Sequence, residues 1–253
     1  MPTPKRVISL VPSWTETLLA VDIVPVGRTR FCIHPDKAVA DIPVVGGTKD
    51  WDWDKILATK PDLILLDREE NARFMAEQAD IPCHATHVTS LEDMALTFAD
   101  LARVLDNDKL QLMAERSRAL LDRQRTCWKP EAPLPALIEW GRRPELRPER
   151  ILYLIWRKPW MAVSRDSFIG DSLARLGVDI VQFDEKYPAI DLDAFDPETT
   201  LLLCSSEPYP FHVRKHLLSE LPFSHAFVNG EWLSWYGIRS LEFLERELGT
   251  ELK

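Results

Sequence analysis

The segment DWDKILATKPDLILLD, residues 52–67, decides the fold class. Its first eight residues, 52–59, have the pattern of a short helix, and Pro61 ends that helix because a proline cannot continue it. The next run, residues 62–67, is continuously apolar between two aspartates, which is typical of a strand buried on both faces of a parallel sheet. A helix that leads directly into a buried strand is the repeating unit of α/β proteins.

The same alternation of strand and helix continues in both directions from this segment. At the start of the chain, Ser13 and Glu16 have the spacing of a capping box, which predicts that a helix begins at Ser13. We expect the other strands at residues 6–11, 24–29, 81–88, 150–156, 161–163, 180–183, 200–205 and 226–230. The sequence therefore predicts two α/β lobes with mostly parallel sheets.

A long helix and a proline-rich segment separate the two halves. Residues 107–128 carry an apolar stripe at helical spacing, and a helix of that length spans about 30 Å, enough to cross from one lobe to another. Residues 129–149 contain several prolines and mark the clearest boundary in composition. The predicted organisation is an N-terminal lobe over 1–106, an interlobe helix over 107–128, a proline-rich connection over 129–149 and a C-terminal lobe over 150–253.

Composition and charge exclude several classes of function. The formal net charge of −9 argues against a general nucleic-acid-binding protein, because phosphate neutralisation needs a basic surface. Because no apolar run approaches the length of a membrane helix, we predict no membrane span. The apolar run near the start, residues 7–11, is too short for a signal peptide, so the chain as given is expected in the cytoplasm. If a leader has been removed, the expected location is the periplasm or the cell surface.

The residues that follow the predicted strands carry most of the tryptophans and many of the cations. Ligands of open α/β sheets bind beyond the carboxyl ends of the strands, so these segments are the predicted binding region. Aromatic rings beside cations suit a flat ligand that carries anionic or carbonyl groups. The alternative is that the tryptophans cap the core and the cations lie along them. The candidate ligand-binding residues are Trp14, Arg28, Arg30, Cys32, His34, Lys49, Trp51, Trp156, Arg157, Trp160, Glu207, Tyr209, Trp235, Tyr236 and Arg239.

Signals for catalysis are weak, and we predict that the protein is not an enzyme. The sequence has no GxSxG, P-loop, GxGxxG or HExxH motif. Cys32 and His34 would share one face of an extended segment, which permits a metal contact, but two ligands are too few for a zinc site. The alternative function is a cytoplasmic metal-binding protein or an enzyme of corrinoid or metal metabolism that uses Cys32 and His34.

The segments RVISLVPSWTETLLA, VPVGRTRFCIHP and KILATKPDLILLD together resemble the helical-backbone solute-binding proteins of ABC importers. This is the class III family, which includes proteins similar to the vitamin B12-binding protein and to TroA, and the later loops look closer to a cobalamin-binding-like branch than to the vitamin B12 receptor. The resemblance implies two Rossmann-like lobes joined by one long rigid interlobe helix, from Asp108 to about Cys127. It also implies a ligand cleft between the lobes, occupied by a metal chelate or tetrapyrrole-like molecule such as a corrinoid, haem or a ferric siderophore.

The resemblance also suggests roles for particular residues. Aromatic walls for stacking are expected from Trp156, Trp160, Trp235 and Tyr236. The polar arms of the ligand are expected to meet Arg28, Arg157 and Arg239. Relatives that dock on an importer carry one acidic residue on each lobe, and the matching positions here are Asp54 and either Asp191 or Asp193. We therefore expect a monomer without a covalent cofactor, with an ABC permease as a partner.

Overall fold

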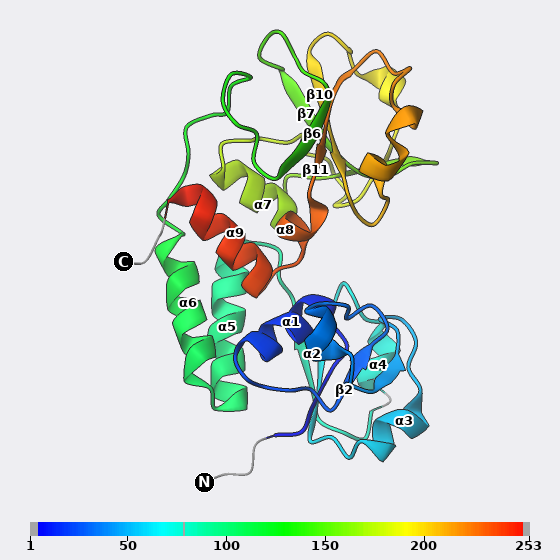
Figure 1. Cartoon of the computed structure of the whole chain (residues 1–253), viewed down its shortest axis with the longest axis vertical. Helices are drawn as coiled ribbons and strands as arrows, with labels where there is room; N and C mark the ends of the chain where they lie inside the picture. Colours follow the sequence, from blue (N-terminus) through cyan, green and yellow to red (C-terminus); the bar gives the residue numbers. More distant parts are fainter. Residues whose placement is uncertain (1–4, 78, 250–253) are drawn as a thin grey trace. The chain divides into compact units, whose positions relative to one another are not determined.

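The chain divides into two compact units, which are described separately below (Figure 1). The computed structural model describes residues 5–77 and 79–249. The predicted lobes also included residues 1–4, 78 and 250–253, which lie outside the described residues. The first unit comprises Met1–Val88, Glu92–Arg118 and Tyr236–Leu241, and the second comprises Thr89–Leu91, Ala119–Trp235 and Glu242–Lys253.

The first unit contains a five-stranded parallel sheet with the strand order β3-β2-β1-β4-β5. Its strands are β1 (Val7–Ser9), β2 (Gly27–Thr29), β3 (Val44–Gly46), β4 (Leu63–Asp67) and β5 (Cys83–Thr86). The central strand β1 pairs with β4 over Val7–Ser9, so the apolar run that opened the sequence analysis is an interior strand between β1 and β5. All five residues of β4 are buried, as a continuous apolar run between helical layers requires.

Helices of the first unit connect these strands in the predicted alternation. They are α1 (Pro12–Ala20), α2 (Asp36–Val39), α3 (Trp53–Ala58), α4 (Arg73–Glu77), α5 (Leu91–Leu105) and α6 (Asp108–Ala119), of which α5 and α6 each extend by one residue into the second unit. The predicted capping box at Ser13 is wrong: α1 begins at Pro12, with Val11 as its N-cap and no side-chain cap. Proline suits the first helical turn because its missing N–H has no partner there in any case. Ser13 is therefore a helical residue.

The second unit contains a six-stranded mixed sheet with the order β6-β11-β10-β7-β8-β9. Its strands are β6 (Leu137–Arg142), β7 (Arg150–Trp156), β8 (Trp160–Val163), β9 (Ala189–Ile190), β10 (Thr200–Ser205) and β11 (Ser224–Val228). The three central strands β7, β10 and β11 are parallel, and the outer strands are antiparallel to their neighbours. Figure 1 labels β6, β7, β10 and β11 of this sheet, with α7 and α8 beside it. A strand predicted at residues 180–183 is wrong, because that segment has no regular structure.

Short helical segments connect the strands of the second unit. They are α7 (Phe168–Arg175), the 3-10 segments η1 (Leu192–Ala194) and η2 (Phe211–Leu217), α8 (Gly230–Ser234) and α9 (Ile238–Leu248), of which α9 begins in the first unit. The start of α7 is fixed by Ser167, whose hydroxyl accepts the N–H of Gly170 at 3.1 Å. Asn229 caps α8 in the same way through the N–H of Trp232. These caps satisfy N–H groups that a helix start leaves without a partner.

The predicted interlobe helix is longer than the observed one. Helix α6 ends at Ala119, and residues 122–127 are exposed and polar, so a helix there would have no apolar face to bury. The backbone N–H groups of Arg125 and Trp128 instead donate to the carbonyls of Arg175 and Gly177 at 2.8 and 2.7 Å. These bonds hold the segment beside the end of α7.

The segment predicted as a proline-rich connection contains a strand. Within residues 129–149, β6 forms an edge of the second sheet and pairs with β11. Ile138 is 44% exposed, and the alternation of apolar and polar residues is weak, which is typical of an edge strand and hides it from a pattern search. The proline content of the segment therefore belongs to the connections on either side of β6.

Candidate ligand-binding site

Four aromatic side chains of the second unit, Trp156, Trp160, Tyr209 and Phe211, pack in one continuous group, which we call the aromatic cluster. The Trp156 ring stands edge-on to Tyr209 with their centroids 5.6 Å apart, and Tyr209 lies 4.6 Å from Phe211. Phe211 and Trp160 are parallel within 7°, with their centroids 6.1 Å apart. Edge-on and offset parallel pairs are the arrangements that aromatic quadrupoles favour. Three of the four residues are among the predicted ligand-binding residues.

The sheet explains why these residues meet. Trp156 ends β7 and Trp160 begins β8, so both lie at the turn of an antiparallel hairpin. The pairing shifts between Leu154 and Trp156, where one extra residue of β7 forms a bulge, a feature that re-aims the neighbouring side chains. Tyr209 and Phe211 follow β10, which is the parallel neighbour of β7. The cluster therefore lies at the carboxyl ends of two adjacent parallel strands, where α/β sheets bind ligands.

The cluster has a buried base and an exposed side. Phe211 is 1% exposed and Tyr209 is 9% exposed, and both belong to the apolar core of the second unit. Trp160 is half-buried against that core, whereas Trp156 is 40% exposed. The structure thus holds one indole in solvent above rigid aromatic neighbours. The exposed indole of Trp156 and the half-buried ring of Trp160 can stack on a flat ligand without prior rearrangement.

Two arginines lie against the cluster. The guanidinium carbon of Arg157 is 5.5 Å from the ring centroid of Trp160, and that of Arg214 is 5.2 Å from the ring centroid of Tyr209. Both contacts are cation–π interactions. Arg214 also donates weakly to the Tyr209 hydroxyl at 3.5 Å. The Nε atom of Arg157 is buried and has no hydrogen-bond partner among residues 5–77 and 79–249.

The segment after β10 is held in place by hydroxyl groups. The Ser205 hydroxyl oxygen lies 3.1 Å from the buried Tyr153 hydroxyl, which donates to it, and it also accepts the N–H of Glu207 at 3.3 Å. Ser206 accepts the N–H of Gly230 at 2.9 Å. A Cβ on Gly230 would lie 2.3 Å from the Ser205 oxygen, so only glycine permits this close approach. Burial raises the pKa of the Tyr153 phenol, which therefore remains a neutral donor.

Glu207 has a partner within the second unit. Its carboxylate accepts a hydrogen bond from the Ser234 hydroxyl at 2.5 Å. This contact ties the segment after β10 to the end of α8, where Trp235 is the half-buried C-cap residue. Glu207 therefore orients the loop after β10. Trp235 directly follows Ser234 in the sequence, at the end of α8.

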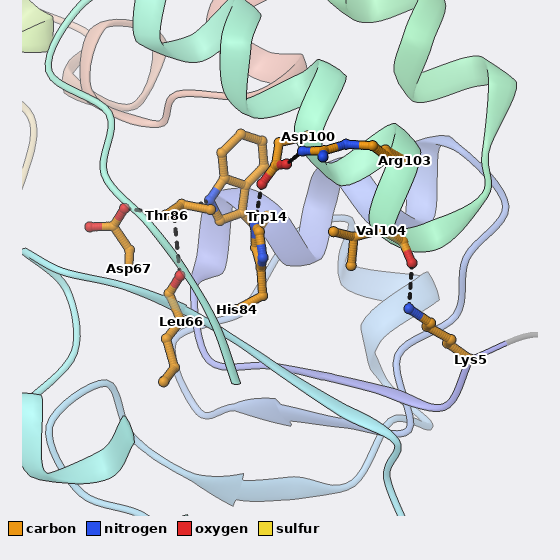
Figure 2. A network of polar contacts seen from close by, with 9 residues as sticks. All are labelled: Lys5, Trp14, Leu66, Asp67, His84, Thr86, Asp100, Arg103 and Val104. Atoms are coloured by element: carbon orange, nitrogen blue, oxygen red, sulfur yellow. Dashed lines mark hydrogen bonds and ion pairs between the residues drawn. The ribbon is translucent and has the colours of Figure 1, made fainter. Parts of the chain in front are cut away.

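Trp14 does not lie on a binding surface, although we predicted that it contacts the ligand. The side chain is 0% exposed and packs against Phe98 and Tyr236, with ring centroids 5.7 and 5.4 Å away. Its indole N–H donates to the Thr86 hydroxyl at 2.9 Å, and that hydroxyl donates to the carboxylate of Asp67 at 2.7 Å (Figure 2). Trp14 is thus a core residue of the first unit.

Tyr236 belongs to the same buried group. The side chain is 8% exposed, so it offers little ring surface for stacking. Burial raises the pKa of its phenol well above the ordinary value, and the nearby carboxylates of Asp67 and Glu70 raise this pKa further. A ligand-wall role for Tyr236 would require the ring to leave Trp14, so we correct that prediction to a core contact.

Arg239 is also occupied within the first unit. Its Nε and Nη2 atoms donate to the two carboxylate oxygens of Glu16 at 2.8 and 2.7 Å, and both side chains are less than one fifth exposed. Such a bidentate pair uses the planar face of the guanidinium. The predicted role of Arg239 in meeting a ligand arm is therefore replaced by a structural ion pair.

The other predicted cations of the first unit have internal partners as well. Arg28 donates to the carbonyls of Val39 and Thr29 at 2.9 and 3.2 Å. Arg30 forms a bidentate ion pair with Asp50 on the surface, at 2.8 and 2.9 Å. Lys49 donates to the Glu69 carbonyl at 2.7 Å, and Trp51 is half-buried against Trp53 and Phe74.

Cys32 is in a poor environment for metal binding. The side chain is 0% exposed, and the hydroxyls of Thr15 and Thr29 lie 3.0 and 3.1 Å from its sulfur. Burial raises the pKa of the Cys32 thiol, which disfavours the thiolate that a metal requires. His34 is half-buried, and the described part of the chain holds no group of three or more His, Cys, Asp or Glu arranged for a metal ion.

The three aspartates predicted to dock on a transporter are all exposed. Asp54 lies in the first turn of α3. Asp191 caps the 3-10 segment η1 by accepting the N–H of Asp193 at 3.1 Å. One carboxylate oxygen of Asp191 is therefore engaged by its own segment, while Asp54 and Asp193 project from element starts.

The sequence analysis missed one residue of the aromatic cluster and one arginine that lies against it. Phe211 and Arg214 lie in the segment that follows β10, and the prediction named only Glu207 and Tyr209 there. The aromatic pair in PYPF, residues 208–211, is a usable signal, because residues two apart on an extended segment share a face. Arg214 gave no signal, since its contact with Tyr209 depends on the turn of η2.

Comparison with known proteins decides the family. Residues 7–199 match the family of periplasmic binding proteins, which is more than half of the chain. The chain belongs to the periplasmic binding protein family. This confirms the resemblance found in the opening segments of the sequence.

Solved structures of this family have the same fold. The chain is similar to the periplasmic vitamin B12 binding protein BtuF of Vibrio cholerae, with a TM-score of 0.68 and 18% identity over 97% of this chain and 96% of that one. It is similar to IsdE of S. aureus complexed with heme, with a TM-score of 0.70 and 13% identity over 99% and 100%. The apo heme-binding protein RhuT from Roseiflexus sp. RS-1 gives a TM-score of 0.69 and 16% identity over 96% of each chain.

Because the sequence identities are low, the similarity to these solved structures establishes the fold of this chain and not its ligand. The predicted α/β architecture of two lobes, one sheet parallel and the other mixed with a parallel centre, is confirmed. Within the described residues, no helix is both long and apolar enough to cross a membrane.

Proposed function

We propose that this periplasmic binding protein is a solute-binding protein for a metal chelate or tetrapyrrole-like ligand, such as a corrinoid, haem or a ferric siderophore. The observation that carries the proposal is the aromatic cluster, in which an exposed indole and two arginines lie beside buried rings at the carboxyl ends of β7 and β10. A flat ligand would stack on Trp156 and Trp160. The similar folds include proteins described as binding vitamin B12 and heme, which supports this ligand class.

In this proposal the protein delivers its ligand to an ABC permease and performs no chemistry on it. One similar structure is described as an ABC transporter substrate-binding protein from Listeria monocytogenes. Asp54, together with Asp191 or Asp193, would meet basic residues of the permease, because all three side chains are exposed. The protein would act as a monomer in the periplasm or at the cell surface, without a covalent cofactor.

The alternative function through Cys32 and His34 has less support. A metal site that uses Cys32 needs its thiolate, and the buried Cys32 sulfur lies beside two hydroxyls that already contact it. The aromatic cluster has no role in that alternative. We therefore retain the ligand-binding proposal.

A thermal-shift panel tests the proposal. Cyanocobalamin, iron protoporphyrin and a ferric siderophore are each added to the full chain, with free ferric and cobalt salts as controls. A true ligand at about 100 times its Kd stabilises the folded state by about 2.7 kcal/mol, which raises the Tm by about 5–10 °C. A panel in which no chelate raises the Tm would contradict the proposal, and a rise with the free salts alone would favour the metal-binding alternative.

A further inference from the structure

Arg157 differs from the other arginines predicted to contact the ligand. Arg30 and Arg239 form bidentate ion pairs with Asp50 and Glu16, and Arg28 donates to backbone carbonyls. Arg157 forms no ion pair with a described carboxylate, and its buried Nε has no hydrogen-bond partner among the described residues. Buried N–H donors in proteins are nearly always paired, so an exception indicates a partner from outside the chain.

The surroundings of Arg157 are poor in negative charge. Its guanidinium lies over Trp160, and the second guanidinium of the cluster, that of Arg214, lies over Tyr209. The described contacts of Arg214 are with that ring and its hydroxyl, so neither arginine is neutralised by a carboxylate there. The whole chain has 40 acidic and 31 basic residues and is therefore negatively charged overall. Two arginines without a carboxylate partner in the described part of the chain make the aromatic cluster a locally positive surface on this negative protein.

A second buried nitrogen without a partner points to the same chemistry. The Nδ1 atom of His212 is buried and has no hydrogen-bond partner in the part of the chain that the structure describes. His212 directly follows Phe211, the base of the aromatic cluster. The segments that hold the cluster therefore contain two buried nitrogens without partners, one of which, on Arg157, is a permanent donor.

The ligand that best completes these groups carries anionic oxygen atoms at the edge of a flat face. A carboxylate or catecholate oxygen would accept a hydrogen bond from Arg157 in which both partners are ionised, so it would also neutralise the guanidinium, which an amide oxygen cannot do. A guanidinium already held over an indole loses little conformational freedom when it forms that bond. Amide-armed ligands can stack equally well but cannot neutralise the arginines.

We propose that Arg157 is a specificity residue that selects anionic metal chelates over neutral, amide-armed ones, with Arg214 adding to the same positive surface. This inference rests on the proposed function, because it names the ligand class for the same aromatic cluster. Carboxylate-bearing tetrapyrroles and ferric catecholates share the required chemistry, and the experiment separates them.

The test compares ligands matched in shape but not in charge. Iron protoporphyrin and its dimethyl ester have the same flat ring, and only the first carries carboxylates. A ferric tris-catecholate and dicyanocobinamide, an amide-armed corrinoid without the phosphodiester of cyanocobalamin, form the second and third arms. Affinities are measured by tryptophan fluorescence for the wild type, Arg157→Gln and Arg157→Lys. The control variant is Arg143→Gln, since Arg143 lies 5.5 Å over Trp140 after β6, with β11 and β10 between that strand and β7.

The expected result is a loss of about tenfold to hundredfold in affinity for one anionic chelate in Arg157→Gln, with its neutral counterpart unaffected. Arg157→Lys should lose less, because it keeps the charge but not the fork. Arg143→Gln should bind as the wild type does. The anionic chelate whose affinity falls in Arg157→Gln shows whether Arg157 binds the carboxylates of a tetrapyrrole or the oxygens of a ferric catecholate.

Different failures are distinguishable. If the wild type binds dicyanocobinamide or the dimethyl ester as tightly as the anionic chelates, the inference is wrong while the proposed function stands. The inference is also wrong if Arg157→Gln binds every chelate with wild-type affinity. If the wild type binds none of the four, both the proposed function and this inference are rejected.

Discussion

Replacing Trp14 with alanine is expected to lower the free energy of unfolding by about 4 kcal/mol. The indole is 0% exposed, packs against Phe98 and Tyr236, and donates to Thr86. Its removal would leave a large cavity and would take the indole donor from the Thr86 hydroxyl, which keeps its bond to Asp67. Urea unfolding followed by circular dichroism measures the change through the shift in midpoint.

Two variants serve as controls for this effect. Trp14→Phe retains most of the ring contacts but loses the bond to Thr86, so it should cost about 1–2 kcal/mol. Trp156→Ala removes an indole that is 40% exposed and should cost less than about 1 kcal/mol. If Trp14→Ala were as mild as Trp156→Ala, Trp14 would lie on a surface after all, as the sequence first indicated.

Replacing Arg239 with methionine is expected to lower the free energy of unfolding by about 2–3 kcal/mol. The substitution leaves the Glu16 carboxylate mostly buried without its bidentate partner, with side chains 18% and 14% exposed in the native pair. Arg30→Met is the matched control, because the pair of Arg30 with Asp50 is 51% and 62% exposed and should contribute about 0.5 kcal/mol or less.

A double variant separates the ion pair from a role in binding. Glu16→Leu combined with Arg239→Met should recover most of the lost stability, because no uncompensated charge remains. Chemical denaturation of the single and double variants gives the coupling between the two side chains. A variant of Arg239 with wild-type stability but weakened ligand binding would restore its predicted role as a ligand contact.

The fold could be predicted because each central strand is recognisable from its own short run of apolar residues. The run at residues 62–67 is apolar on both faces, and it becomes β4 with all five residues buried. Edge elements follow different rules: β6 has an exposed Ile138 and lies among prolines, so its pattern resembled a linker. The segment after α6 is held by backbone bonds to the carbonyls of Arg175 and Gly177, which no local sequence pattern reveals.

The candidate site was predictable only where the contacts are close in the sequence. Trp156 and Trp160 share one hairpin, so their proximity followed from the strand pattern. Trp14 also follows a strand, but it is buried and its indole donates to Thr86, 72 positions away. Arg239 meets Glu16 across 223 positions. A tryptophan or arginine after a strand end therefore has the same local sequence pattern whether it is a core residue or a ligand contact. Only tertiary packing distinguishes the two.

The most direct measurement of ligand binding by the aromatic cluster is a fluorescence titration of the wild type and of two tryptophan variants. Trp156→Ala removes the exposed indole of the cluster, whereas Trp140→Ala removes an indole on β6 that also lies beneath an arginine. A metal chelate or tetrapyrrole that quenches the wild type should bind Trp156→Ala about thirtyfold more weakly, equivalent to about 2 kcal/mol. It should bind Trp140→Ala with wild-type affinity. Equal affinity of all three proteins for the ligand would contradict the assignment of the binding site to the aromatic cluster.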